Sequence, residues 1–130
     1  ELAEARLAES NRKRRRQVSA AIHKSSDALY LNAWQRKIER IGNLNYPAKA
    51  RMDKIYGTLK MKIGINQDGT LENVQILSSS GFKVLDDAAL RIVHMAAPYS
   101  PLPPQIRKNT DVLEIIRVWQ FLPGNLISTQ

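Results

Sequence analysis

The stretch Asp111-Val112-Leu113-Glu114-Ile115-Ile116-Arg117-Val118-Trp119-Gln120-Phe121 is the most strongly β-coded part of the chain. It is rich in β-branched and aromatic residues, and neither Gly nor Pro interrupts it before Pro123. Residues two apart in a strand share a face. One face is therefore apolar and is interrupted by Arg117; its members are Leu113, Ile115, Trp119 and Phe121. Such a strand needs a cover on at least one side, and a free edge has to be protected or used. We expect that this edge is used.

The totals indicate one globular domain with an arm. The chain has 130 residues, of which 43% are apolar, and it contains no cysteine. Disulfides and thiolate chemistry are therefore excluded. No apolar run approaches the roughly 18 to 20 residues of a membrane span. Because there is no start methionine or signal-peptide pattern, we expect a C-terminal fragment of a longer protein.

The positive charge is concentrated in the first part of the chain. The net charge is +8, of which residues 1–40 carry +5. Residues 1–24 lack Gly and Pro, and this composition predicts a helix that contains the basic run Arg12-Lys13-Arg14-Arg15-Arg16. Two interpretations stay open: a solvated linker helix, or a contact with an anionic envelope surface or polymer. Nucleic-acid binding is disfavoured, because no aromatic or Gly-rich pattern interleaves the charges.

Periodicity and punctuation predict the remaining elements. Ser25-Ser26-Asp27 is a typical N-cap for a helix over about 27–41, which Gly42 would end. A short helix follows Pro47 and continues to about Lys54. An alternating strand over 58–65, a turn at 66–69 and a return strand over 70–78 predict a hairpin. A helix over 85–96 follows, and four prolines between 98 and 104 predict irregular chain before the last strand.

The order of these elements predicts an α+β two-layer sandwich, with helices on one face of a three-stranded mixed sheet and a helical N-terminal arm. The strand at 58–65 would lie in the middle, antiparallel to its neighbours, because the later crossover makes the outer strands parallel. The last strand would then lie at an edge. We divide the chain into an arm (1–26), a domain (27–124) and a tail (125–130).

No pattern in the sequence indicates catalysis or a cofactor. His23 and His94 are too isolated for a metal site. A Ser80–His94–Asp87 arrangement lacks the surroundings of a nucleophile elbow, and Asp86-Asp87 fit the start of a helix. We therefore expect no enzyme activity, no metal and no cofactor.

The motifs in order resemble the TonB C-terminal domain family. The resemblance covers about residues 27–122 and rests on Trp34, on Lys37 through Pro47, on Asp68-Gly69, on Ser79-Ser80-Gly81 and Leu85 through Ala89, on Ala97 through Pro101, and on Arg117 through Phe121. It implies a periplasmic domain of a protein that is anchored in the inner membrane of a Gram-negative bacterium and works with the ExbB–ExbD motor. Such a domain binds the TonB box of outer-membrane transporters for ferric siderophores, haem or cobalamin.

An extended peptide would add to the last strand through backbone hydrogen bonds. The expected partner-binding residues are Val112, Leu113, Glu114, Ile115, Ile116, Arg117, Val118 and Trp119. The resemblance adds a second region, Asn43, Leu44, Asn45, Tyr46 and Pro47, although Tyr46-Pro47 also fits a purely structural role at a helix start. Arg117 is expected to reach past the edge to solvent, Glu114 or Asp111, or else to contact acidic groups of the transporter.

Two alternatives remain from the sequence. The basic arm would make the chain a periplasmic scaffold or envelope-polymer-binding module. The edge strand could also pair with a second copy and give a homodimer.

Overall fold

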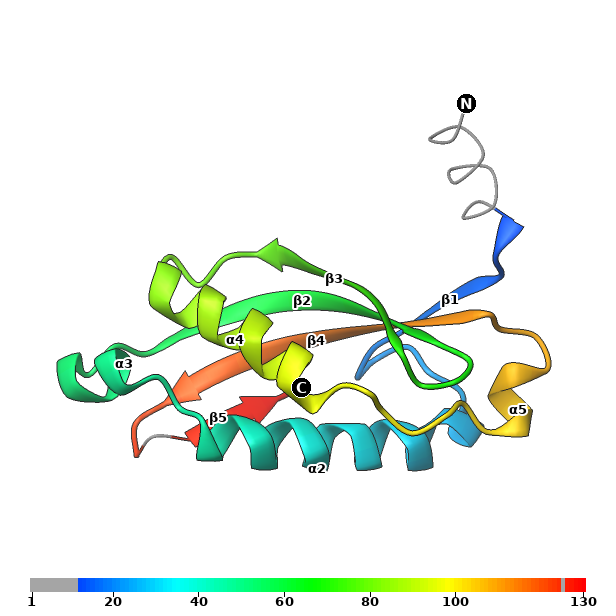
Figure 1. Cartoon of the computed structure of the whole chain (residues 1–130), viewed down its shortest axis with the longest axis horizontal. Coiled ribbons are helices and arrows are strands. Elements are labelled where there is room, and N and C mark those ends of the chain that lie inside the picture. Colours follow the sequence, from blue (N-terminus) through cyan, green and yellow to red (C-terminus); the bar gives the residue numbers. More distant parts are fainter. Residues whose placement is uncertain (1–11, 125) are drawn as a thin grey trace.

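The computed structural model describes residues 12–124 and 126–130. Within them, a mixed sheet is covered on one face by two helices, so the α+β two-layer fold is confirmed (Figure 1). The long strands are β2 (Gly57–Asn66), β3 (Leu71–Ser78) and β4 (Val112–Leu122). The middle strand β2 is antiparallel to both neighbours, as expected.

The main helices are α2 (Ala28–Leu44) and α4 (Lys83–Ala96). A 3-10 turn, η1 (Ser25–Asp27), precedes α2, and the short helix α3 (Ala48–Asp53) follows it. Figure 1 shows α4 across one face of the sheet and α2 alongside β5 (Leu126–Thr129). These positions place the two apolar helix stripes over the same side of β2 and β4.

The core lies between this helix layer and the sheet. The four odd-numbered apolar residues of β2 are at most 1% exposed, and so are four apolar residues on the same face of β4. They are Leu59, Met61, Ile63 and Ile65 on β2, and Leu113, Ile115, Trp119 and Phe121 on β4. The period-2 reading of both strands is therefore confirmed. The opposite face carries Lys60 and Lys62 and remains partly open.

Two short strands were not expected. Residues 15–18 lie in the expected N-terminal helix, but they form a strand, β1 (Arg15–Val18), and residues 126–129 of the expected tail form β5. Each short strand gains hydrogen bonds and a buried side chain on β4, which outweighs the helix propensity of an isolated basic segment. Residues 19–24 of the expected helix are also not helical, and its residues 1–11 lie outside the described residues.

The expected end of the helix over 27–41 at Gly42 was wrong. Gly42 lies inside α2, which continues to Leu44. A Cβ at Gly42 would lie 3.0 Å from Ile127 Cδ1, so the glycine makes room for β5 instead of ending the helix. The proline-rich segment also differs from expectation, because Pro104–Arg107 forms one helical turn, α5.

Candidate functional site

The outer edge of β4 is covered by the chain itself, which corrects the expectation of a free edge. β1 pairs in parallel with the first half of β4, setting Arg15 opposite Val112 and Val18 opposite Ile115. β5 pairs antiparallel with the second half, from Trp119 to Leu122. The edge strand of the predicted three-stranded sheet is therefore an inner strand at both ends.

The even-numbered residues of β4 direct their backbone groups toward this outer edge. Val118 and Gln130 exchange two backbone hydrogen bonds, of 2.7 and 2.8 Å, and the Val112 N–H donates to Arg14 O at 3.2 Å. Because backbone directions alternate along a strand, Glu114, Ile116 and the other even-numbered residues also point outward. An incoming strand would need these same groups.

Arginines fasten β1 to the domain through ion pairs. Arg16 donates from both terminal nitrogens to the carboxylate of Asp27, each at 2.7 Å, and Asp27 is fully buried. This guanidinium holds the pKa of Asp27 below its ordinary value. Arg14 makes a similar but exposed pair with Asp111, which lowers the pKa of Asp111 to about 2.

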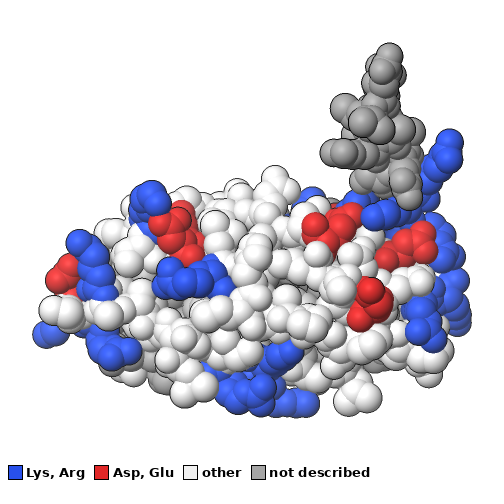
Figure 2. All heavy atoms as spheres, viewed as in Figure 1, with Lys and Arg blue, Asp and Glu red and all other residues white. Residues whose placement is uncertain are grey.

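Arg15 lies on the open face of the sheet and joins two acids. It pairs with Glu72 of β3, and its Nη1 lies 3.3 Å from Glu114 Oε2. Lys62 Nζ lies 3.7 Å from the same Glu114 oxygen. Figure 2 shows acidic and basic side chains interspersed at the end of the molecule that carries the start of β1 and α5. Much of the basic run is therefore neutralised within the domain, so the solvated-linker interpretation is wrong for Arg14, Arg15 and Arg16.

Side chains of α2 protect the outer side of β5. Asn43 Oδ1 accepts the Ile127 N–H at 2.7 Å, and Glu39 Oε2 accepts the Thr129 N–H at 2.8 Å. The Ile127 side chain is 3% exposed and fills the space beside Gly42. Polar caps on alternate N–H groups leave β5 a poor template for further pairing.

Arg117 is buried on the helix-covered face, which corrects the expectation that it reaches solvent, Glu114 or Asp111. Its exposed fraction is 5%, and those two acids pair with Arg15 and Arg14 instead. No hydrogen bond or ion pair joins it to another described residue, and its Nε is buried without a partner. Burial lowers the pKa of Arg117, while the charge of Glu39 partly offsets this. A buried N–H that lacks an acceptor among the described residues is costly to keep.

The two expected contact regions are brought together only in part. Asn43 lies next to β4 through β5, whereas Leu44 is 79% exposed and the Asn45 side chain caps α2 by donating to Ile41 O at 2.8 Å. The remaining two residues, Tyr46 and Pro47, are buried, and Tyr46 packs edge-on against Phe121 with ring centroids 5.7 Å apart. The Tyr46 hydroxyl is buried without a partner. Their role in partner binding stays a prediction.

A groove marks the seam between β1 and β5. Its main part has a volume of about 350 Å³ and lies over the open face. It is lined by residues 19–22 after β1, by Lys60, by Ile116 and Val118 of β4, and by Gln130. A smaller hollow of about 140 Å³ adjoins it beside Val18. The described part of the chain thus leaves room over β4 at this seam.

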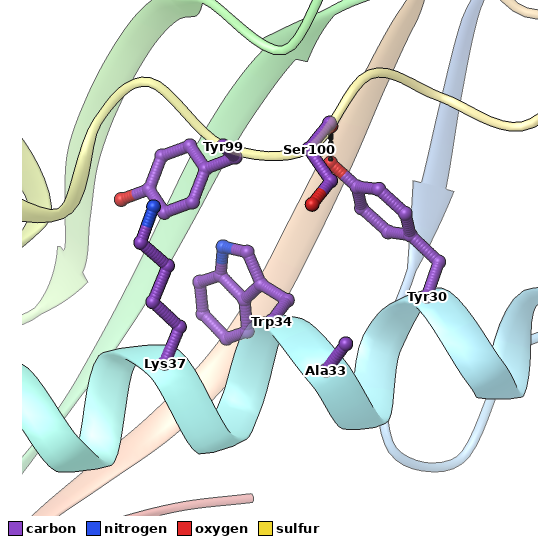
Figure 3. Close-up of a pocket in the computed structure, with 6 residues that line it drawn as sticks. All are labelled: Tyr30, Ala33, Trp34, Lys37, Tyr99 and Ser100. Atoms are coloured by element: carbon purple, nitrogen blue, oxygen red, sulfur yellow. Dashed lines mark hydrogen bonds between the residues drawn. The ribbon is translucent and has the colours of Figure 1, made fainter.

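A second, smaller cavity lies between α2 and the segment after α4 (Figure 3). Its volume is about 40 Å³, and Trp34, Tyr99 and Lys37 surround it. The Tyr30 hydroxyl donates to Ser100 O at 2.7 Å, and burial raises the pKa of Tyr30 to about 12. Trp34 Nε1 has no partner. This volume suits ordered water and no larger ligand.

Within residues 12–124 and 126–130, no three His, Asp or Glu side chains gather where they could hold a metal ion. Likewise, none of the described helices has the length and apolar character needed to cross a membrane. The serines near Asp86 close the loop before α4: Ser80 Oγ donates to Asp86 Oδ1 at 2.6 Å.

Sequence reasoning missed β1 and β5, although one signal for β5 was present. Pro123-Gly124 is a turn pair, and Gly124 has a φ of 90°. β-Branched residues follow it at Ile127 and Thr129, a pattern typical of a hairpin. β1 had no comparable signal, because Arg-Arg-Gln-Val alone does not favour a strand.

Comparisons with known proteins agree with this fold. A family model described as "Gram-negative bacterial TonB protein C-terminal" matches residues 42–121. Protein TonB of Pasteurella multocida is 35% identical over 89 residues, covering 68% of this chain and 34% of that protein. Protein TonB of Haemophilus influenzae is 31% identical over 72 residues, covering 55% and 26%. This chain therefore spans about a third or less of the curated relatives' lengths.

A solved structure supports the same assignment. The NMR structure of the Helicobacter pylori TonB C-terminal domain superposes with a TM-score of 0.50 and 28% identity, covering 67% of this chain and 88% of that one. β1 and β5 both lie outside the residues that the family model matches. Because that match covers more than half of the chain, the chain belongs to the TonB C-terminal domain family.

Proposed function

We propose that this chain is the non-catalytic, periplasmic end of an energy transducer in a Gram-negative envelope. It binds the TonB box of an outer-membrane transporter by strand addition to β4 and passes on work from an ExbB–ExbD motor. The cargo class is ferric siderophores, haem or cobalamin. Family membership supports the role in TonB-dependent transport.

The observation that carries this proposal is the double occupation of the β4 edge. β1 and β5 have four residues each, one parallel and one antiparallel to β4. An edge that accepts both directions has backbone groups suited to a further extended segment. A single continuous strand could replace both short strands, and each backbone hydrogen bond would contribute about 0.5–1.5 kcal/mol net.

The same observation sets the cost of binding. Val18 and Ile127 are 1% and 3% exposed, so each short strand buries an apolar side chain on the helix-covered side. An incoming segment regains that burial only if it carries apolar side chains at alternate positions. Which segments bind would thus depend mainly on whether apolar side chains stand at alternate positions, and this suits one transducer that serves several transporters.

The test uses the whole chain labelled with nitrogen-15 and a synthetic TonB-box peptide. We expect the amide signals of residues 112–122 to shift and those of β1 or β5 to move toward unfolded positions. A peptide with proline at alternate positions is the control, because it cannot donate the ladder hydrogen bonds. Unchanged β4 signals at saturating peptide would exclude strand addition at this edge.

The basic-arm alternative has weaker support. Arg14, Arg15 and Arg16 already pair with carboxylates of the domain, which leaves less uncompensated charge for an anionic polymer. Pairing between two copies would have to displace the same short strands, and family membership supports only the transport role. We therefore place both alternatives behind transporter binding.

A further inference from the structure

At the seam between β1 and β5, Arg117 of β4 has no strand residue paired with it on the outer edge. Val18 faces Ile115 and Thr129 faces Trp119, and these two β4 residues flank Arg117 on the same face. Continuing the β1 register would set Ala20 opposite Arg117. The chain instead turns after Val18, with the Ser19 N–H donating to Ile22 O at 2.8 Å, and Ala20 is exposed. β5 reaches only as far as Gln130, opposite Val118.

The guanidinium at this position makes no ion pair or hydrogen bond with another described residue. Arg117 is 5% exposed, and its Nε is buried without a hydrogen-bond partner. Glu39 is the acid whose charge it feels, but Glu39 Oε2 already accepts from the Thr129 N–H and from Gln35 Nε2. A buried cation in this state gains most from a carboxylate that arrives with an additional strand.

We propose that Arg117 is a charge-reading subsite of the β4 edge, which pairs with a carboxylate side chain of the incoming strand at the position opposite it. This inference rests on the proposed strand addition and names the chemistry of the segment that is preferred. In such a segment, the acidic residue lies between apolar residues two positions away, which occupy the places of Val18 and Thr129. The residues directly before and after the acidic residue point to the other face and lie over the groove beside Ile116 and Val118.

The register allows a probe peptide to be designed directly. An acetylated, amidated peptide of sequence Leu-Ile-Ser-Thr-Gln-Glu-Thr-Val copies residues 126–130 and then continues antiparallel to β4. Its Glu falls opposite Arg117, and its final Val falls opposite Ile115, in the seat of Val18. The matched control replaces only that Glu by Gln, which keeps shape and hydrogen-bonding capacity but removes the charge.

The experiment titrates both peptides into the wild-type chain and into the Arg117→Met variant, with Kd measured by calorimetry. The Nε–H signal of Arg117 is followed by NMR. We expect the Glu peptide to bind wild type roughly tenfold more tightly than the Gln peptide, since a buried charge pair is worth more than a neutral one. The Glu peptide should also shift the Nε–H signal and slow its exchange with solvent. In Arg117→Met the two affinities should agree within about twofold.

Each possible result bears on the role of Arg117. Equal affinities of the two peptides for wild type would overturn the role of Arg117 while leaving strand addition standing. A Glu preference that survives in Arg117→Met would also overturn it and would point to another cation, such as Lys60 in the groove. If neither peptide binds and the β4 amide signals stay in place, strand addition itself fails, and this inference fails with it. The wild-type comparison holds even if the variant does not fold.

Discussion

Arg16 and Asp27 form a two-pronged ion pair, with both nitrogen–oxygen distances at 2.7 Å, that ties β1 to the turn before α2. The Asp27 side chain is fully buried, and the Lys24 N–H donates to its Oδ2 at 2.9 Å. This pair therefore controls whether the first half of the β4 edge stays covered.

Replacing Arg16 by Met should lower the free energy of unfolding by about 3–5 kcal/mol, because it leaves a buried carboxylate without its counter-ion. Denaturant unfolding measures this change. Arg14→Met is the matched control: its pair with Asp111 is exposed, so the loss should stay below about 1 kcal/mol. Equal losses of stability in the two variants would contradict the view that burial sets the strength of these ion pairs.

Acid should loosen β1 through Asp27. Arg16 lowers the pKa of Asp27 in the folded state from the ordinary 3.8, so the unfolded chain takes up the proton first. The stabilisation is complete above the ordinary pKa and is lost as pH falls through the lower folded value. Carbon-13 shifts of the Asp27 carboxyl should show it still ionised at pH 3.8. In Arg16→Met the pKa of Asp27 should rise relative to the wild-type chain, because the largest lowering contribution is removed while burial remains.

Substituting Gly42 by Leu should release β5. A Cβ there would lie 3.0 Å from Ile127 Cδ1 and 3.6 Å from Ile92 Cδ1, so a larger side chain has no room unless β5 moves. The amides of Ile127 and Gln130 should exchange at least roughly tenfold faster with deuterium, as in a locally opened segment. Arg40→Leu is the control, since it adds the same apolar side chain to an exposed position of α2. Unchanged protection in Gly42→Leu would show that Ile127 does not anchor β5.

Tyr46 and Tyr99 should respond in opposite ways to removal of the hydroxyl. The buried Tyr46 hydroxyl has no hydrogen-bond partner among the described residues, so Tyr46→Phe should stabilise the fold or leave it unchanged, within about 1 kcal/mol. The Tyr99 hydroxyl donates to Val93 O at 2.7 Å, so Tyr99→Phe should destabilise by about 1–3 kcal/mol because the buried carbonyl loses its donor. Thermal and denaturant unfolding of both variants check this. A clear loss of stability in Tyr46→Phe would reveal a hydrogen bond to solvent or to another part of the chain.

Much of the fold could be predicted from the sequence because its signals are local. Alternation in β2 and β4, the turn at Gly69 and the stripe of α4 each depend on neighbours within a few residues. The antiparallel placement of β2 against β4 followed from the crossover, which makes the two outer strands parallel and leaves the middle strand antiparallel to both. The strand β4 was predicted because an apolar strand of this length has to pair, and its role in partner binding stays a prediction.

The cover of that strand could not be predicted in the same way. Arg16 meets Asp27, and Ile127 meets Gly42, only after chain segments far apart in sequence have come together. From the sequence alone, a basic run is interpreted as solvated because the carboxylates that pair with it are distant in sequence. Likewise, a glycine near a helix end is interpreted as a cap because the strand that packs against it is distant in sequence.

The sequence by itself determined that β4 would be the strand around which the domain is built, since β-branched and aromatic residues at period 2 need a buried face. Only the tertiary structure decided what lies on its edge. Backbone pairing is nearly independent of side-chain identity, so the segment that occupies an edge is chosen by long-range packing and charge. Those same contacts left Arg117 buried at the seam, with its Nε–H unpaired among the described residues.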